Sequence, residues 1–398
     1  MAEGKPWETP GRGEEVRVPE DRKRRIAEAL RGAYLGLVSE VLDSGITNVA
    51  DLEMAVENAL DMKAPFRLMN DLGPAASLAL VEAYAKTHPG FPVGKCLRER
   101  AASGRPWTVP VVLRQDRGDV AVVVIRRPKL LNALDAVAFE QIAERMREIR
   151  AEGAIRAAVL TGFGVKAFVS GADVRFLSRI ASAEDGERTC LESQAVLNLV
   201  QELGKPVVCA LNGVAFGGGM ELAMACTARI ARRGMGILGG QPEPNLGIIP
   251  GAGGTQRLPR IVGIEKGAEI LRTGRPVSAG EAERIGLVQE LCEGDLLDAA
   301  VGIARALADG SRKAPGLPRA PLPSVPAALP PLDLGHLSRR IDAILCETIL
   351  AGARGTLEEG LKLEARKFGE CVGTEDMRIG IRNFMENGPG AKAAFVHR

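Results

Sequence analysis

Two glutamates stand alone in apolar, glycine-rich parts of the chain. Glu221 directly follows three glycines and a methionine, and Glu243 is the only acid in residues 241–258 (QPEPNLGIIPGAGGTQRL). A carboxylate among apolar residues loses hydration, which raises its pKa toward values useful for acid–base work. Such a pair suits proton transfer on a substrate conjugated to a carbonyl group. From the residues alone, each glutamate could instead be a solvated surface acid.

The glycine-rich segment 212–222 (NGVAFGGGMEL) lies between a predicted strand at 207–211 and a predicted helix at 221–226. Glycines let a ligand approach the backbone closely, and a helix start presents unpaired N–H groups. The segment could therefore bind an anion or a developing oxyanion. The glycines could equally well serve tight packing of the strand against the helix.

Another glycine segment, 162–167 (GFGVKA), matches the pattern GxGxxA after a predicted strand. Dinucleotide binding at such a turn requires a helix to begin at once. Residues 168–171 are typical of an extended or turn conformation instead. We therefore interpret the segment as an ordinary loop.

Composition excludes several classes of protein. The chain has 398 residues, 46% hydrophobic and 26% charged, with a formal charge of +2, which favours a globular protein and gives no support for a nucleic-acid surface. The uncharged stretch 206–220 is too short and glycine-rich to span a membrane, and the N-terminus lacks a secretory signal. The three histidines and seven scattered cysteines lack metal-ligand spacing. We expect no metal site and a cytoplasmic location with reduced thiols.

The hydrophobic pattern along the sequence predicts that the chain has several parts. Helical periodicity covers 21–45, 51–60 and 75–85, whereas strands at 109–113, 120–125, 157–161 and 207–211 alternate with helices at 136–151 and 191–203. This alternation indicates an α/β fold with mostly parallel strands, followed by helices at 337–353, 357–371 and 375–385. The predicted parts are a flexible tail (1–20), a helical module (21–103), an α/β core (108–314), a proline-rich connector (315–334) and a C-terminal helical region (335–398).

Four motifs in order carry a family resemblance. They are residues 127–134 (RPKLLNAL), 166–173 (KAFVSGAD), 212–223 (NGVAFGGGMELA) and 241–258. The chain from about 109 to 384 resembles the crotonase superfamily, and specifically the enoyl-CoA hydratases. The resemblance implies a crotonase-like spiral of ββα turns, with C-terminal helices that support a homotrimer or a dimer of trimers.

The resemblance also implies roles for individual residues. The amides of Ala172 and Gly218 would bind the thioester oxygen of an acyl-CoA substrate. Glu221 would hold and activate water, and Glu243 would exchange a proton with the substrate α-carbon or share the water. No cofactor is implied, because CoA is part of the substrate. The residues implied on the CoA side are Lys129, Leu131, Ser170, Ala172, Asp173, Val174 and Arg175. The acidic segment 183–187 is expected to be a loop that shapes acyl-chain preference.

The N-terminal module resembles the C-terminal helical domain of 3-hydroxyacyl-CoA dehydrogenases. The residues that carry this are 39–42 (SEVL), 51–53 (DLE) and 64–73 (APFRLMNDLG). The NAD-binding half of such enzymes has no counterpart here, so the module is expected to dock a separate dehydrogenase half or merely to cap the core. Two rival functions remain, a double-bond isomerase on the same scaffold and a non-catalytic acyl-CoA-binding subunit. The presence of both glutamates favours the hydratase.

Overall fold

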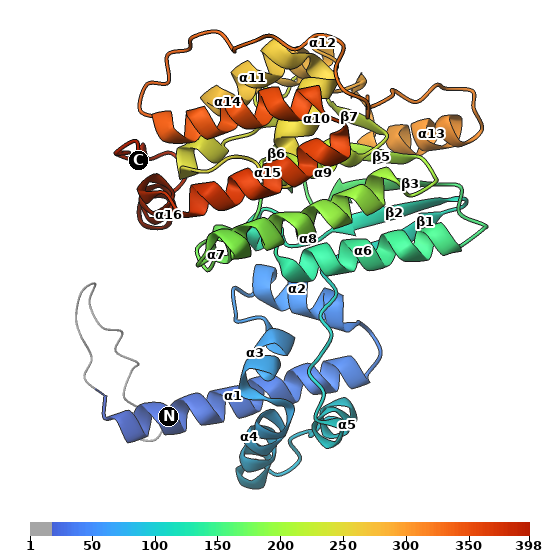
Figure 1. The fold of residues 1–398 in the computed structure, drawn as a ribbon. Coiled ribbons are helices and arrows are strands. Elements are labelled where there is room, and N and C mark those ends of the chain that lie inside the picture. The colour runs from blue at the N-terminus through green and yellow to red at the C-terminus, as the bar shows by residue number, and fades with distance from the viewer. Residues whose placement is uncertain (1–17) are drawn as a thin grey trace. The chain divides into compact units, whose positions relative to one another are not determined.

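The computed structural model describes residues 18–398, so most of the predicted tail at 1–20 lies outside the described residues. The chain divides into two compact units, Met1–Pro110 and Val111–Arg398 (Figure 1). No helix in the described part of the chain is long and apolar enough to cross a membrane.

The described part of the N-terminal unit is helical. Its core is formed by Leu35, Phe66, Met69, Val81 and Leu97, which are fully buried. Two of its helices escaped the sequence prediction because they are short, with eight and nine residues. The helices are α1 (Glu20–Asp43), α2 (Val49–Ala59), α3 (Pro65–Leu72), α4 (Pro74–Thr87) and α5 (Lys95–Ser103).

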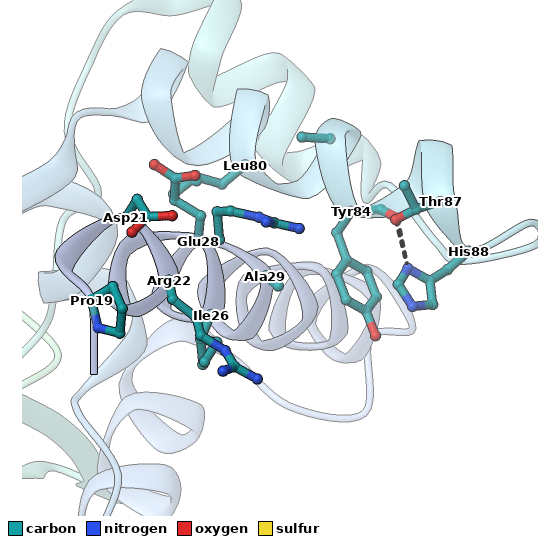
Figure 2. Close-up of a pocket in the computed structure, with 12 residues that line it drawn as sticks. Pro19, Asp21, Arg22, Ile26, Glu28, Ala29, Leu80, Tyr84, Thr87 and His88 are labelled. Carbon is teal, nitrogen blue, oxygen red and sulfur yellow. Dashed lines mark hydrogen bonds between the residues drawn. The ribbon is translucent and has the colours of Figure 1, made fainter. Parts of the chain in front are cut away.

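A pocket in this unit is lined by residues of α1 and α4 (Figure 2). The ring of Tyr84 stacks on that of His88, with centroids 3.9 Å apart. The Thr87 hydroxyl lies 3.0 Å from Nδ1 of His88. None of the site residues predicted from the sequence lines this pocket. The candidate site is therefore in the C-terminal unit.

Two sheets organise the C-terminal unit. Within the described residues, a six-stranded sheet has the order β1-β2-β3-β5-β7-β9, and a three-stranded sheet has the order β4-β6-β8. All pairs are parallel except β1 with β2. The strands are β1 (Val112–Arg117), β2 (Val120–Ile125), β3 (Ala157–Gly162), β4 (Ala167–Val169), β5 (Val207–Leu211), β6 (Val214–Phe216), β7 (Ala228–Arg232), β8 (Gly239–Gly240) and β9 (Glu290–Cys292).

The first strand differs from its prediction. The strand expected at 109–113 begins at Val112 and continues to Arg117, so the turn is limited to Gly118 and Asp119. β1 is an edge strand, where polar side chains remain in solvent and the apolar pattern that marks a buried strand is lost. Segment 162–167 leads into the short strand β4 rather than a helix, which supports its interpretation as a loop.

Helices cover both faces of the large sheet. Alternate residues of β2, such as Val120 and Val122, pack with α13 (Leu296–Ala308), whereas Ala121 and Val123 join the main core on the other face. That core also receives α6 (Ala136–Ala151) and α8 (Ala183–Gln201). The other elements that precede α13 are η1 (Pro128–Leu130), α7 (Val174–Leu177), α9 (Gly218–Ala225), η2 (Glu243–Leu246), α10 (Gly254–Val262), α11 (Ile264–Thr273) and α12 (Ala279–Arg284).

The expected loop at 183–187 is the first turn of α8 instead. The Ser182 side chain accepts a hydrogen bond from the Asp185 amide and thereby caps the helix, while Glu184 and Asp185 lie where the helix dipole favours negative charge. Polar residues concentrated at a helix start resemble a loop in the sequence. The prediction that this segment is a loop is therefore wrong, while its role in acyl-chain preference stays a prediction.

The C-terminal helices follow a segment without regular structure at 313–334, which includes the predicted proline-rich connector. They are α14 (Arg339–Arg354), α15 (Leu357–Val372) and α16 (Glu375–Asn387), close to their predicted ranges. Helix α15 packs against α8, α10 and α14 and contributes Ala365 and Phe368 to the main core. It thus extends the core around the loops that follow β6 and β8.

Candidate active site

The two predicted glutamates lie next to the same pair of glycines. Glu221 is in the first turn of α9 and is 2% exposed, and Glu243 begins η2 and is 8% exposed. A Cβ built on Gly217 would overlap Oε1 of Glu243, and one built on Gly218 would lie 4.0 Å from Oε2 of Glu221. The structure therefore brings together two buried carboxyl groups that are separated in sequence.

Helix α9 begins at Gly218, three residues earlier than predicted, because Gly217 takes a conformation that favours glycine. Its φ is 49° and its ψ −124°, and a residue with a side chain would be strained in this backbone conformation. Gly219 has a different role, since a Cβ there would overlap the carbonyl oxygen of Val169. Close packing, one of the two uses considered from the sequence, is therefore confirmed at Gly219, whereas binding of an anion by the cluster stays a prediction.

The two amides predicted to bind an oxyanion are also close together. Strand β4 pairs with β6 through Ala167 and Val214, and this places the loop after β4 beside the start of α9. The Ala172 nitrogen lies 3.6 Å from the position of a Cβ on Gly218. Within residues 18–398, neither of these two amides donates a hydrogen bond to another protein group. Both N–H groups are therefore available to a ligand oxygen.

One oxygen of Glu221 is anchored by backbone amides. Its Oε1 accepts hydrogen bonds from Ala252 (2.8 Å) and Gly254 (2.7 Å). Burial raises the pKa of Glu221 to about 7, although the two amides and the guanidinium of Arg257 favour the ionised form. The anchoring of Oε1 leaves Oε2 as the oxygen on the Gly218 side.

The Glu243 carboxyl is harder to ionise. Burial is the main cause that raises its pKa well above the usual range, and the negative charge of Glu221 adds to it. With the Gln241 amide turned by 180°, its nitrogen would lie 3.0 Å from Oε2 of Glu243. Two neighbouring carboxyl groups whose proton affinities differ are suited to act as base and acid in one reaction.

The sequence analysis missed Glu364, a third buried glutamate among the described residues of the C-terminal unit. It lies on α15, is fully buried, and accepts hydrogen bonds from the amides of Gly253 (2.6 Å) and Thr255 (2.9 Å). Burial and the charge of Glu221 raise its pKa to about 8, while its bonds from Thr255 and Gly253 oppose this. The sequence contains a pattern that could have identified Glu364, because this acid interrupts the apolar face that Leu361 and Phe368 define on the helix.

The residues implied on the CoA side lie in two connected loops. The Leu134 amide donates to the carbonyl oxygen of Gly171 (2.9 Å), and the Asp173 amide donates to that of Leu134 (2.8 Å), which joins the loop after β2 to the loop after β4. Ser170 donates its amide to Leu131 (3.1 Å). The two loops therefore form one surface that includes the Ala172 amide.

Charged side chains on this surface have defined places. Arg175 is exposed and pairs with Asp173, whose carboxylate accepts from Nη2 at 2.9 Å and also caps α7. The hydrogen bonds from the guanidinium and the backbone amide of Arg175 lower the pKa of Asp173, although its partial burial opposes this. Lys129, in η1, and Leu131 are exposed, whereas Val174 is half-buried at the start of α7. The described residues include no cluster of three potential metal-ligating side chains.

Comparison with known proteins agrees with this arrangement. The family described as enoyl-CoA hydratase/isomerase matches residues 115–316. The short-chain-enoyl-CoA hydratase of Clostridium acetobutylicum is 35% identical over 276 residues, which cover 69% of this chain and 94% of that protein. The crotonyl-CoA hydratase of Syntrophomonas wolfei is 34% identical over 288 residues, covering 72% and 98%.

A solved structure shares the fold. An enoyl-CoA hydratase/isomerase from Xanthobacter autotrophicus Py2 has a TM-score of 0.54 and 26% identity, and the alignment covers 71% of this chain and 95% of that one. The crotonase-like α/β fold expected from the motifs is thereby confirmed. From its sequence, fold and relatives, the chain belongs to the enoyl-CoA hydratase/isomerase family.

Proposed function

We propose that this chain is an enoyl-CoA hydratase, which adds water to a 2-enoyl-CoA thioester and forms a 3-hydroxyacyl-CoA. The observation that carries the proposal is the approach of Glu221 and Glu243 to Gly217 and Gly218, beside the amide of Ala172. The names of the two curated relatives support the same reaction class. CoA belongs to the substrate, and the proposed reaction uses no other cofactor.

The two free amides act on the thioester oxygen. Addition of water to carbon 3 moves negative charge onto that oxygen in an enolate-like transition state. The N–H groups of Ala172 and Gly218 donate to it, and each preorganised donor is worth about 3–4 kcal/mol in comparable oxyanion holes. Because Gly218 is the first residue of α9, the positive end of the helix dipole adds to this stabilisation.

The two glutamates carry the protons. Ionised Glu221 takes one proton from water as the water oxygen bonds to carbon 3. Protonated Glu243 gives a proton to carbon 2, and the proposed addition is syn, with both new bonds on one face of the double bond. The higher pKa of Glu243 supports its role as the acid, and a pKa near 7 suits Glu221 as the base.

CoA binding is proposed on the surface formed by the two connected loops. Lys129 and Arg175 are exposed cations there and suit the CoA phosphates, while Leu131 and Val174 suit the pantetheine. Ser170 and Asp173 hold the loop in shape, the latter through Arg175. Assembly as a homotrimer or a dimer of trimers, a separate NAD-binding dehydrogenase partner, and a cytoplasmic location stay predictions.

The double-bond isomerase is the second candidate function. Isomerisation needs one base to move a proton between two carbons, and it has no use for a second carboxyl group that activates water. The anchored, buried Glu221 favours hydration because its desolvation would otherwise be a cost without a function. A non-catalytic acyl-CoA-binding subunit would likewise have no use for it.

Hydration of crotonyl-CoA by the purified chain tests the proposal. We expect the absorbance of the conjugated thioester to fall, and 3-hydroxybutyryl-CoA to be recovered. The same protein is assayed with a panel of 2-enoyl-CoAs of increasing length and with a 3-enoyl-CoA. Turnover of the 3-enoyl-CoA alone would favour the isomerase, and the absence of turnover with every substrate would overturn an enzymatic function.

A further inference from the structure

Two glutamates from different helices divide four consecutive amides between them. Glu221 of α9 accepts from Ala252 and Gly254, whereas Glu364 of α15 accepts from Gly253 and Thr255. The four N···O distances range from 2.6 to 2.9 Å. Successive N–H groups of segment 252–255 are thus held alternately from two sides, and the direction of one set determines that of the other.

Every donor that reaches Glu364 requires an acceptor. Besides the two amides, its oxygens accept from Nε2 of Gln194 (3.1 Å) and from the hydroxyl of Thr255 (2.5 Å). The bonds from Thr255 and Gly253 favour the ionised form of Glu364 against its burial. In that form the carboxylate is an acceptor only and satisfies all four donors, whereas an amide side chain of the same shape would present an NH2 group to some of them. The four hydrogen bonds are therefore matched to the carboxylate of Glu364 and not to an amide of the same size.

We propose that Glu364 is a positioning residue for Glu221. This inference rests on the proposed function, in which Glu221 activates water. By holding the amides of Gly253 and Thr255, Glu364 turns those of Ala252 and Gly254 toward Oε1 of Glu221. The carboxylate of Glu221 is then fixed with Oε2 on the Gly218 side, where the water must be held.

The substitution Glu364→Gln tests this. Its NH2 group would face Gly253 or Thr255, one buried donor would lose its acceptor, and the segment would shift. We expect kcat for crotonyl-CoA hydration to fall about 10- to 100-fold, since small displacements of a reacting group have effects of this size. KM should change by less than about threefold, because the proposed CoA contacts lie in other loops.

A double-mutant cycle separates positioning from a general structural effect. In the Glu221→Gln background, the carboxylate that Glu364 positions is already absent, so adding Glu364→Gln should leave the residual rate unchanged. A merely structural role would lower the rate by the same factor in both backgrounds and would overturn the inference. Glu370→Gln is the matched control on α15, because Glu370 is partly exposed and pairs with Lys367.

Thermal melting shows whether the variant folds, and Thr255→Val provides a second test if it does not. Valine keeps the shape of threonine and removes the hydroxyl, which donates to Glu364 and accepts from Nε2 of Gln256. We expect kcat to fall severalfold in the wild-type background and not in the Glu221→Gln background. Equal loss in both backgrounds, or no loss in either, overturns the inference. An inactive wild type refutes the proposed function and the inference with it, whereas an active wild type with unaltered variants refutes the inference alone.

Discussion

Oε1 of Glu221 accepts a hydrogen bond of 2.7 Å from the amide of Gly254, the first residue of α10. The same oxygen also accepts from Ala252, so both anchors are on one side of the carboxylate. A base that is held through one oxygen keeps the other free for water without rotation of the side chain. This asymmetry connects the geometry of α10 to the proposed chemistry at α9.

Removal of either carboxylate should abolish most of the activity. Glu221→Gln and Glu243→Gln are each expected to lower kcat for crotonyl-CoA at least about 100-fold, because acid–base groups typically contribute this much. Binding of a CoA ester, measured by calorimetry, should persist in both variants, since the side chains keep their size. A near-normal rate in one variant would refute the role of that residue alone.

The rate should fall at both low and high pH, because the base Glu221 must be ionised and the acid Glu243 must be protonated. Glu221 must be ionised and its pKa is about 7, so kcat/KM should fall about tenfold per pH unit well below that value. Glu243 must be protonated, and since its pKa is raised well above the usual range, the rate should fall again only at alkaline pH. The measurement is kcat/KM for crotonyl-CoA across the pH range in which the protein stays folded. An acid limb centred at the ordinary pKa of a glutamate would contradict this assignment.

Gly217→Ala should damage the site directly. The new Cβ would overlap Oε1 of Glu243, and the backbone conformation of Gly217 disfavours any side chain. We expect kcat to fall more than about tenfold as Glu243 is displaced, together with a lower melting temperature. Gly302→Ala, on α13, is the control because a Cβ there meets no atom within 4 Å. Equal activity of both variants would show that the close approach of Gly217 to Glu243 is unimportant.

The chain alone should not oxidise 3-hydroxyacyl-CoA. The glycine turn and His–Glu pair of the NAD-binding dehydrogenase half have no counterpart in the sequence, and the described N-terminal unit is helical. Incubation with 3-hydroxybutyryl-CoA and NAD should therefore produce no NADH absorbance. Clear NADH formation by the pure chain would show that the resemblance of the N-terminal module had been misread.

Local patterns predicted the elements that have strong periodicity and the two glutamates of the site. Strands β2 and β5 and helix α6 have the predicted bounds, because β-branched runs and an apolar stripe reflect local packing needs. Glu221 and Glu243 were singled out because each stands alone among apolar residues and glycines in the sequence, where an isolated charge is visible. Short strands and α9 were less well predicted, since glycines carry little propensity of their own.

Tertiary contacts determine the features of the site that the sequence did not reveal. The approach of Ala172 to Gly218 depends on the register of β4 with β6, which joins loops far apart in the chain. Glu364 reaches the segment 252–255 only because α15 packs against α10, and nothing near residue 364 in the sequence indicates that partner. Residue types thus establish which groups can exchange protons, while the packing of distant helices and strands decides how those groups are oriented, because hydrogen-bond direction depends on partners brought together only in the folded chain.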